Sequence, residues 1–164
     1  MKTTRNKILL ITVITIFQFC KSQDTKKYAD SYNKNVPKLQ SLAEDKKQFY
    51  NGNFSDFINE MEKKHIEIIN YGYSGRTDVQ EDIYILNLWL VNRENLDMIR
   101  KNDYQTPIIL VYFKEQIPNE LKILTQKYEG ELSPEVIEFL ADRKIEKIEF
   151  YGINGLKSTD RSVR

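Results

Sequence analysis

The sequence contains a single cysteine and a single histidine among 164 residues, and each shortage excludes a class of site. With Cys20 as the only cysteine, no disulfide can form within the chain, so the fold depends on an apolar core. Because His65 is the only histidine, the His-Glu-x-x-His zinc motif and any Cys/His zinc cluster are excluded. No glycine-rich stretch ends in Gly-Lys-Ser/Thr, so a phosphate loop of that type is absent. We therefore expect a domain without a metal ion or cofactor.

Long apolar runs are also missing, since crossing a bilayer takes about 20 apolar residues. The longest predominantly apolar run, residues 8–17, follows Lys2, Arg5 and Lys7 and precedes the small residues Cys20 and Ser22. A charged start, a short apolar stretch and a small-residue exit resemble an export signal. We predict that residues 1–22 form such a signal. The mature protein then begins near Gln23 and works in the periplasm or at the cell exterior.

Cys20 raises the question of a lipid anchor, because its position resembles that of the acylated cysteine in bacterial lipoprotein signals. Those signals carry a small residue just before the cysteine, whereas Phe19 stands there in this chain. Ordinary signal peptidase requires small residues at the last and third-last positions, which Ser22 and Cys20 provide. The pattern favours cleavage after Ser22. A lipidated Cys20, which would hold the protein on a membrane leaflet, remains the alternative.

Removing the predicted signal changes the balance of charge. The whole chain has 25 basic and 24 acidic residues, and four basic but no acidic residues lie within residues 1–22. The remainder therefore carries 21 basic and 24 acidic residues, a net charge near −3. Such a mixed, slightly acidic surface does not attract nucleic acid, and it would meet a membrane only through a lipidated Cys20.

The remaining sequence predicts one domain of class α+β over residues 34–164, preceded by a flexible N-terminal segment at residues 23–33. Apolar periodicity and capping residues predict helices at 36–50, 54–61, 92–101, 118–129 and 133–140. Alternating or continuous apolar residues predict strands at 66–71, 83–91, 107–113 and 145–151. The predicted order is α-α-β-β-α-β-α-α-β.

The arrangement of the strands follows from their connections. The strand-helix-strand segment from Ile83 to Phe113 is long enough for a right-handed parallel crossover, and the first two strands can pair antiparallel. Two of the strands are apolar at nearly every position, which is typical of strands covered on both faces. We predict a mixed four-stranded sheet with packed helices on both faces.

Candidate catalytic residues are few. His65 ends a predicted helix, where an imidazole can interact with the helix dipole, and we interpret it as structural. The Gly72–Arg76 segment lacks the second glycine of a nucleophile elbow and is read as a turn. Three loop carboxylates, Asp78, Glu81 and Asp82, could bind a calcium ion or act as acid and base with help from His65. A solvated loop is the interpretation that we favour for them.

An internal similarity supplies the candidate binding residues. Residues 71–78 and 151–160 both follow a strand and both read Tyr-Gly-x-Ser/Asn-Gly, then a basic residue and Thr-Asp. Convergence is the simpler explanation, because tight turns draw on few residue types. The alternative is that the two strand exits lie side by side and form one rim for a peptide or glycan. That rim would consist of Tyr71, Tyr73, Arg76, Asp78, Tyr151, Asn154, Lys157 and Asp160.

These observations lead to three hypotheses of function. The first is an exported, non-catalytic domain that binds a protein, peptide or glycan partner in the cell envelope. The second is an envelope hydrolase that uses the loop carboxylates. The third is an immunity or inhibitor protein that covers one partner through a flat, tyrosine-rich patch.

Overall fold

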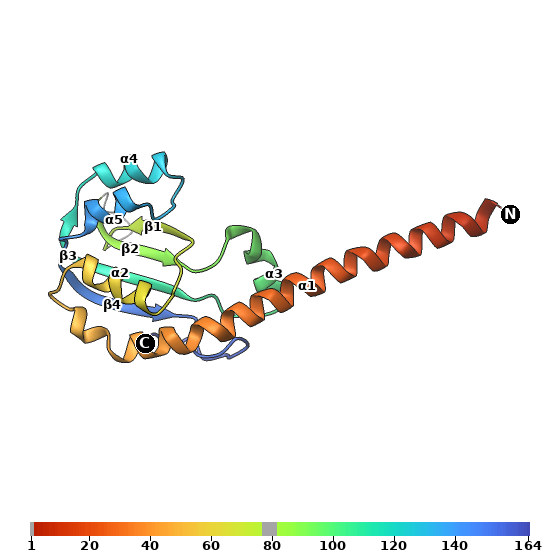
Figure 1. Ribbon diagram of the computed structural model, residues 1–164, viewed down its shortest axis with the longest axis horizontal. Coiled ribbons are helices and arrows are strands. Elements are labelled where there is room, and N and C mark those ends of the chain that lie inside the picture. Colours follow the sequence, from red (N-terminus) through yellow and green to blue (C-terminus); the bar gives the residue numbers. More distant parts are fainter. Residues whose placement is uncertain (1, 77–81) are drawn as a thin grey trace.

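The fold is built on one four-stranded sheet with the strand order β1-β2-β3-β4 (Figure 1). The computed structural model describes residues 2–76 and 82–164, with side chains from residue 23 onward. The helices are α1 (Lys2–Glu44), α2 (Phe54–Lys63), α3 (Leu96–Lys101), α4 (Glu120–Lys127) and α5 (Pro134–Leu140). The strands are β1 (Asn70–Ser74), β2 (Ile83–Trp89), β3 (Ile108–Ile117) and β4 (Ile145–Tyr151). Two 3-10 helices are η1 (Lys46–Phe49) and η2 (Arg93–Asn95). The predicted α+β class and order of elements are confirmed.

The three strand pairs are all antiparallel. The expected pairing of the first two strands is confirmed, because Tyr71 of β1 lies opposite Leu88 of β2. The expected parallel crossover is wrong, since Leu88 pairs antiparallel with Ile109 of β3. The helix in this connection, α3, has only six residues, and the connection returns the chain to the end of the sheet that it left. The sheet is therefore a simple meander rather than a mixed sheet.

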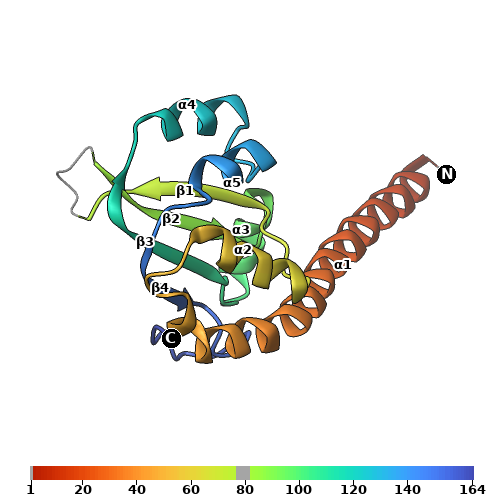
Figure 2. The ribbon, with the colours of Figure 1, turned by 60° about the vertical axis from the view of Figure 1, so that its left-hand side comes forward.

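One face of the sheet carries the core. Alternate strand residues on this face, such as Leu88, Ile109 and Phe150, are fully buried in a single apolar cluster. Helices α1, α2, α4 and α5 contribute buried side chains to the same cluster: Leu39, Leu42, Phe54, Phe57, Leu121, Val136 and Leu140. In Figure 1, α2 lies in front of the sheet, and Figure 2 shows the same layering from the side. The domain thus has one layer of helices on one face of the sheet.

The opposite face does not join that cluster, so the expectation that helices cover both faces is wrong. Trp89, Ile108, Leu110 and Tyr112 point to this second face, because they alternate with the core residues along β2 and β3. They are half-buried, and among the described residues the core cluster does not include them. An antiparallel sheet can leave one face open in this way. A strand of such a sheet can still be apolar at every position, so its sequence resembles that of a strand covered on both faces.

Residues 23–33, which were expected to be flexible, belong to α1. Tyr28 and Tyr32 are buried and begin a stripe that continues through Val36, Leu39 and Ala43 at helical spacing. The two rings are tilted by 53° with their centroids 6.2 Å apart, and Tyr28 stacks on Tyr104 at 5.9 Å. The helical periodicity therefore starts two turns earlier than expected, and tyrosines rather than aliphatic residues carry it.

Gln105 joins α1, the start of β3 and the C-terminal loop. Its side chain is fully buried, and its Nε2 atom donates hydrogen bonds to the carbonyls of Ser158 (2.8 Å) and Asp160 (2.7 Å). Its backbone N–H donates to the carbonyl of Leu156 at 2.7 Å, and its own carbonyl accepts from the Tyr28 hydroxyl. Burial raises the pKa of Tyr28 above its usual value, which keeps this hydroxyl protonated as a donor. Three distant segments are therefore held at one residue.

Replacing Gln105 with leucine should destabilise the domain by about 1–2 kcal/mol, because the carbonyls of Ser158 and Asp160 lose their donor. Urea unfolding followed by circular dichroism measures this change. Gln126→Leu, on the exposed side of α4, is the matched control and should stay within about 0.5 kcal/mol of wild type. Equal stability of the two variants would contradict the role given to Gln105.

Candidate functional site

The two Tyr-Gly strand exits lie at opposite ends of the sheet and do not form the predicted rim. Four antiparallel strands in sequence order place β1 and β4 on opposite edges, running in opposite directions. After β1, Arg76 pairs with Glu146 and donates to the carbonyl of Phe113 at 3.1 Å, both near the start of β4. After β4, Lys157 lies 5.5 Å from the ring centroid of Tyr104, at the other end. The candidate residues that the structure describes therefore do not converge.

The described candidate residues from the first strand exit contact other parts of the fold. Tyr71 is buried, and its hydroxyl is 2.9 Å from Oγ1 of Thr125 in α4. Tyr73 is half-buried and packs against the core cluster. Asp78 lies outside the described residues.

The candidates from the second exit mostly stabilise the C-terminal loop. Asn154 donates to the carbonyl of Ser162 at 2.8 Å, and its Oδ1 accepts from Arg164 at 2.6 Å. Asp160 accepts from the backbone N–H of Ser162, and hydrogen bonds from Ser162 lower the pKa of Asp160. Tyr151 differs from them, because it lies on the second face of the sheet.

The two Tyr-Gly motifs require glycine for different reasons. Gly72 is needed because Trp89 packs on it: a Cβ at this position would lie 2.7 Å from Cη2 of the indole ring. Gly152 has a positive φ of 67°, and a Cβ there would lie 2.1 Å from the carbonyl oxygen of Thr106. One glycine seats a side chain and the other allows a backbone turn. Their local causes support convergence as the origin of the internal similarity.

His65 ends α2, as expected, through backbone geometry. It has a φ of 52°, and its N–H and that of Ile66 donate back to Glu62 (2.9 Å) and Met61 (2.9 Å). This pair of bonds is the Schellman ending, in which glycine is the usual residue at the His65 position. The His65 side chain is exposed.

The loop carboxylates do not meet His65 in the described structure. Asp78 and Glu81 lie outside the described residues, and Asp82 accepts a hydrogen bond from Gln116 at 2.8 Å. Asp82 leads into β2, beside the end of β1, whereas His65 precedes the start of β1. Among the side chains of residues 23–76 and 82–164, no group of three histidine, cysteine or acidic residues could hold a metal ion.

The side chain of Cys20 is not described, so its lipidation stays a prediction. Among the helices that the structure describes, none is long and apolar enough to span a bilayer.

The second face of the sheet is the most distinctive surface of the domain, and we call it the open sheet face. We define it by the side chains that point away from the helices: Ile85, Asn87, Trp89, Ile108, Leu110, Tyr112, Lys147, Glu149 and Tyr151. They form rows across the strands, for example Trp89, Ile108 and Tyr151. Ile85 is buried, and the other side chains of the open sheet face are half-buried. Partly exposed apolar side chains that gather on one sheet face are typical of an interaction surface.

A polar network crosses this face. The carboxylate of Glu149 accepts hydrogen bonds from Tyr112 (2.8 Å), Tyr151 (3.1 Å) and Lys147 (2.7 Å). Burial raises the pKa of Glu149, but the three donors outweigh this effect, so the pKa lies below its ordinary value. Burial is the largest cause that raises the pKa values of Tyr112 and Tyr151. The hydrogen bonds to Glu149 and its negative charge raise these pKa values further. The network thus fixes an ionised carboxylate and two neutral phenols on the open sheet face.

A groove borders the open sheet face where β2 leads into α3, and we call it the Trp89 groove. Its volume is about 370 Å³, and its apolar wall consists of Trp89, Val91, Leu96 and Ile108. Its polar rim consists of Asn70, Thr106, Arg93 and Arg100. Cζ of Arg93 lies 6.0 Å from the ring centroid of Trp89. Trp89 is the only tryptophan of the chain, and it belongs to both surfaces.

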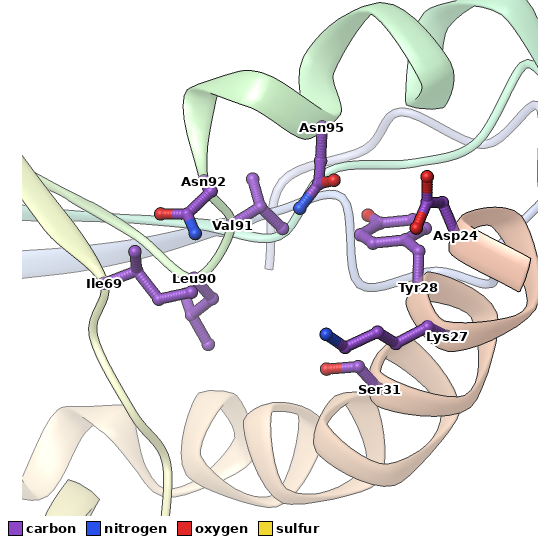
Figure 3. Close-up of a pocket in the computed structure, with 9 residues that line it drawn as sticks. All are labelled: Asp24, Lys27, Tyr28, Ser31, Ile69, Leu90, Val91, Asn92 and Asn95. Atoms are coloured by element: carbon purple, nitrogen blue, oxygen red, sulfur yellow. The ribbon is translucent and has the colours of Figure 1, made fainter. Parts of the chain in front are cut away.

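A second, more polar cleft of about 260 Å³ lies between α1 and the segment after β2. In Figure 3, Lys27 extends from α1 into this cleft, and Asn92 and Asn95 lie across it. Ile69 and Leu90 provide its apolar wall. Val91 lines both the cleft and the Trp89 groove, so the two hollows are neighbours.

These surfaces were not predicted from the sequence, because the apolar strands were expected to be buried on both faces. A usable signal exists in β3, where Leu110 and Tyr112 alternate with Ile109 and Val111 and give two apolar faces. Helices supply core partners for only one of them.

Comparison with known proteins finds no matching protein family, no matching characterised protein and no matching solved structure.

Replacing His65 with glycine should stabilise the domain by about 1 kcal/mol, because glycine adopts the left-handed conformation without a Cβ clash. Thermal unfolding measures the change. A lower melting temperature for His65→Gly would show that the imidazole contributes more than its position suggests.

The Glu149 network should make part of the stability depend on pH. Because the folded-state pKa is lowered, its contribution is complete above the unfolded value of 4.5 and is lost as the pH falls below it. Glu149→Gln should therefore be less stable than wild type at about pH 7, with a smaller difference at about pH 4. Urea unfolding at both pH values measures this. The exposed Glu138→Gln is the control, and a difference for Glu149→Gln that does not change with pH would contradict the assignment.

Proposed function

We propose that the protein is an exported, non-catalytic binding domain that docks a protein partner on its open sheet face. The observation that carries the proposal is the group of aromatic and aliphatic side chains on a face that does not join the core cluster of the described chain. Trp89, Tyr112 and Tyr151 belong to this group, and tryptophan, tyrosine and arginine are the residues enriched in protein interfaces.

The export part of the proposal rests on the signal-like residues 1–22. A location in the periplasm or at the cell exterior follows from it, and a lipidated Cys20 would add a membrane anchor. An immunity or inhibitor protein is a special case of the same proposal, because it also needs a flat aromatic patch for one partner.

A charge placed in the middle of the open sheet face should abolish docking. Leu110 is half-buried there, and Leu110→Lys keeps an aliphatic stem while adding an ammonium that the partner would have to desolvate. The tagged protein is used to capture partners from envelope extract of the source organism, and the prey is quantified by mass spectrometry. We expect a prey that falls about tenfold or more with Leu110→Lys.

Ile123→Lys provides the matched control, because Ile123 is 66% exposed on α4 and the substitution adds the same charge. This variant should retain the prey of wild type. Circular dichroism checks that both variants are folded. Equal recovery of every prey by wild type, Leu110→Lys and Ile123→Lys would contradict docking on the open sheet face.

A further inference from the structure

The Trp89 groove joins an apolar wall to a positive rim. Trp89 and Ile108 belong both to this groove and to the open sheet face, so a partner that covers the face also reaches the groove. Leu96 of α3 closes the apolar wall on the other side. The groove is therefore a local pocket at one end of a larger, flatter surface, which is where interface anchors usually insert.

Gly72 of β1 provides the surface on which the indole ring of Trp89 packs. The far edge of its six-membered ring lies over Gly72 of β1, because a Cβ there would be 2.7 Å from Cη2 and 3.1 Å from Cζ3. A larger residue at this diagonal position across the strand pair would force the indole ring to shift. The aromatic part of the groove is thus fixed before a ligand arrives, which reduces the ordering cost of binding.

The two arginines of the rim have no acidic partner among the described side chains. Both Arg93 and Arg100 are exposed, and with the side chains of residues 23–76 and 82–164 neither forms an ion pair. The neighbouring acidic residues Glu94 and Asp97 are also exposed and do not pair with them. Guanidinium groups bind carboxylates through paired, charge-assisted hydrogen bonds. The rim is therefore complementary to a carboxylate next to an apolar group.

We infer that the Trp89 groove receives a segment of the partner polypeptide in which an apolar side chain is followed by an acidic one. The apolar side chain lies against Trp89, and the carboxylate lies between Arg93 and Arg100. This inference rests on the proposed function, because it names the feature of the partner that the open sheet face selects.

The fluorescence of Trp89 tests the inference directly, since no other tryptophan contributes to the signal. The probes are two blocked tetrapeptides that differ in one residue: a phenylalanine followed by glutamate, and a phenylalanine followed by glutamine. Titration into the full protein should quench Trp89, with the glutamate peptide binding about tenfold more tightly. Equal binding of the two peptides, or no binding of either, would overturn the inference.

Arg100→Gln and Lys101→Gln form a matched pair, because both remove one positive charge from the end of α3 and only Arg100 lines the groove. Arg100→Gln should bind the two peptides alike, whereas Lys101→Gln should keep the preference of wild type. A preference that survives in Arg100→Gln overturns the assignment of the carboxylate. Tighter binding of decanoate than of the glutamate peptide overturns it in favour of an acyl ligand.

The outcome is separable from that of the proposed function. If Leu110→Lys loses its prey while the peptides are not distinguished, only the groove assignment fails. If Leu110→Lys retains every prey, docking on the open sheet face fails, whatever the peptides do.

Discussion

The hydrogen bonds of the buried Gln105 join three distant segments of the chain at the start of β3. Through Tyr28 they hold α1, and through Ser158 and Asp160 they hold the C-terminal loop, all at the start of β3. With α1 held there, its apolar stripe packs with α2 on the core face of the sheet. A buried amide with several backbone partners is costly to disrupt, so this arrangement is strongly specified.

The open sheet face is the consequence of that one-sided packing. One layer of helices covers one face, and the apolar residues of β2 and β3 that point the other way stay half-buried. Two features adapt this face to a partner: Glu149 is held ionised by three donors, and Trp89 is seated on Gly72. Both features fix side chains in advance, and preorganised contacts contribute more to binding than mobile ones. The Trp89 groove adds positive charge to a domain whose charge is otherwise balanced.

Much of the fold could be predicted from local patterns. The strand at 145–151 was predicted to the residue because apolar and polar side chains largely alternate in it, and α5 because Ser133 and Pro134 form a clear start. The packing could not be predicted in the same way. Two apolar faces on β3 look like a strand buried on both sides, and the return of the chain through the short α3 has no local signal. Tyr28 and Tyr32 were missed because tyrosine occurs equally often on surfaces. The Tyr-Gly motif misdirected the site, since each glycine has its own local steric cause.

One face of this sheet is open and the other is closed by helices. Hydroxyl-radical footprinting of the folded protein, read by mass spectrometry, measures the solvent accessibility of individual side chains on both faces. We expect oxidation of Trp89, Leu110 and Tyr112, with protection of their neighbours Leu88, Val111 and Phe113. Protection of Trp89 and Tyr112 as strong as that of the buried Tyr71 would contradict this expectation, because the face would then be covered.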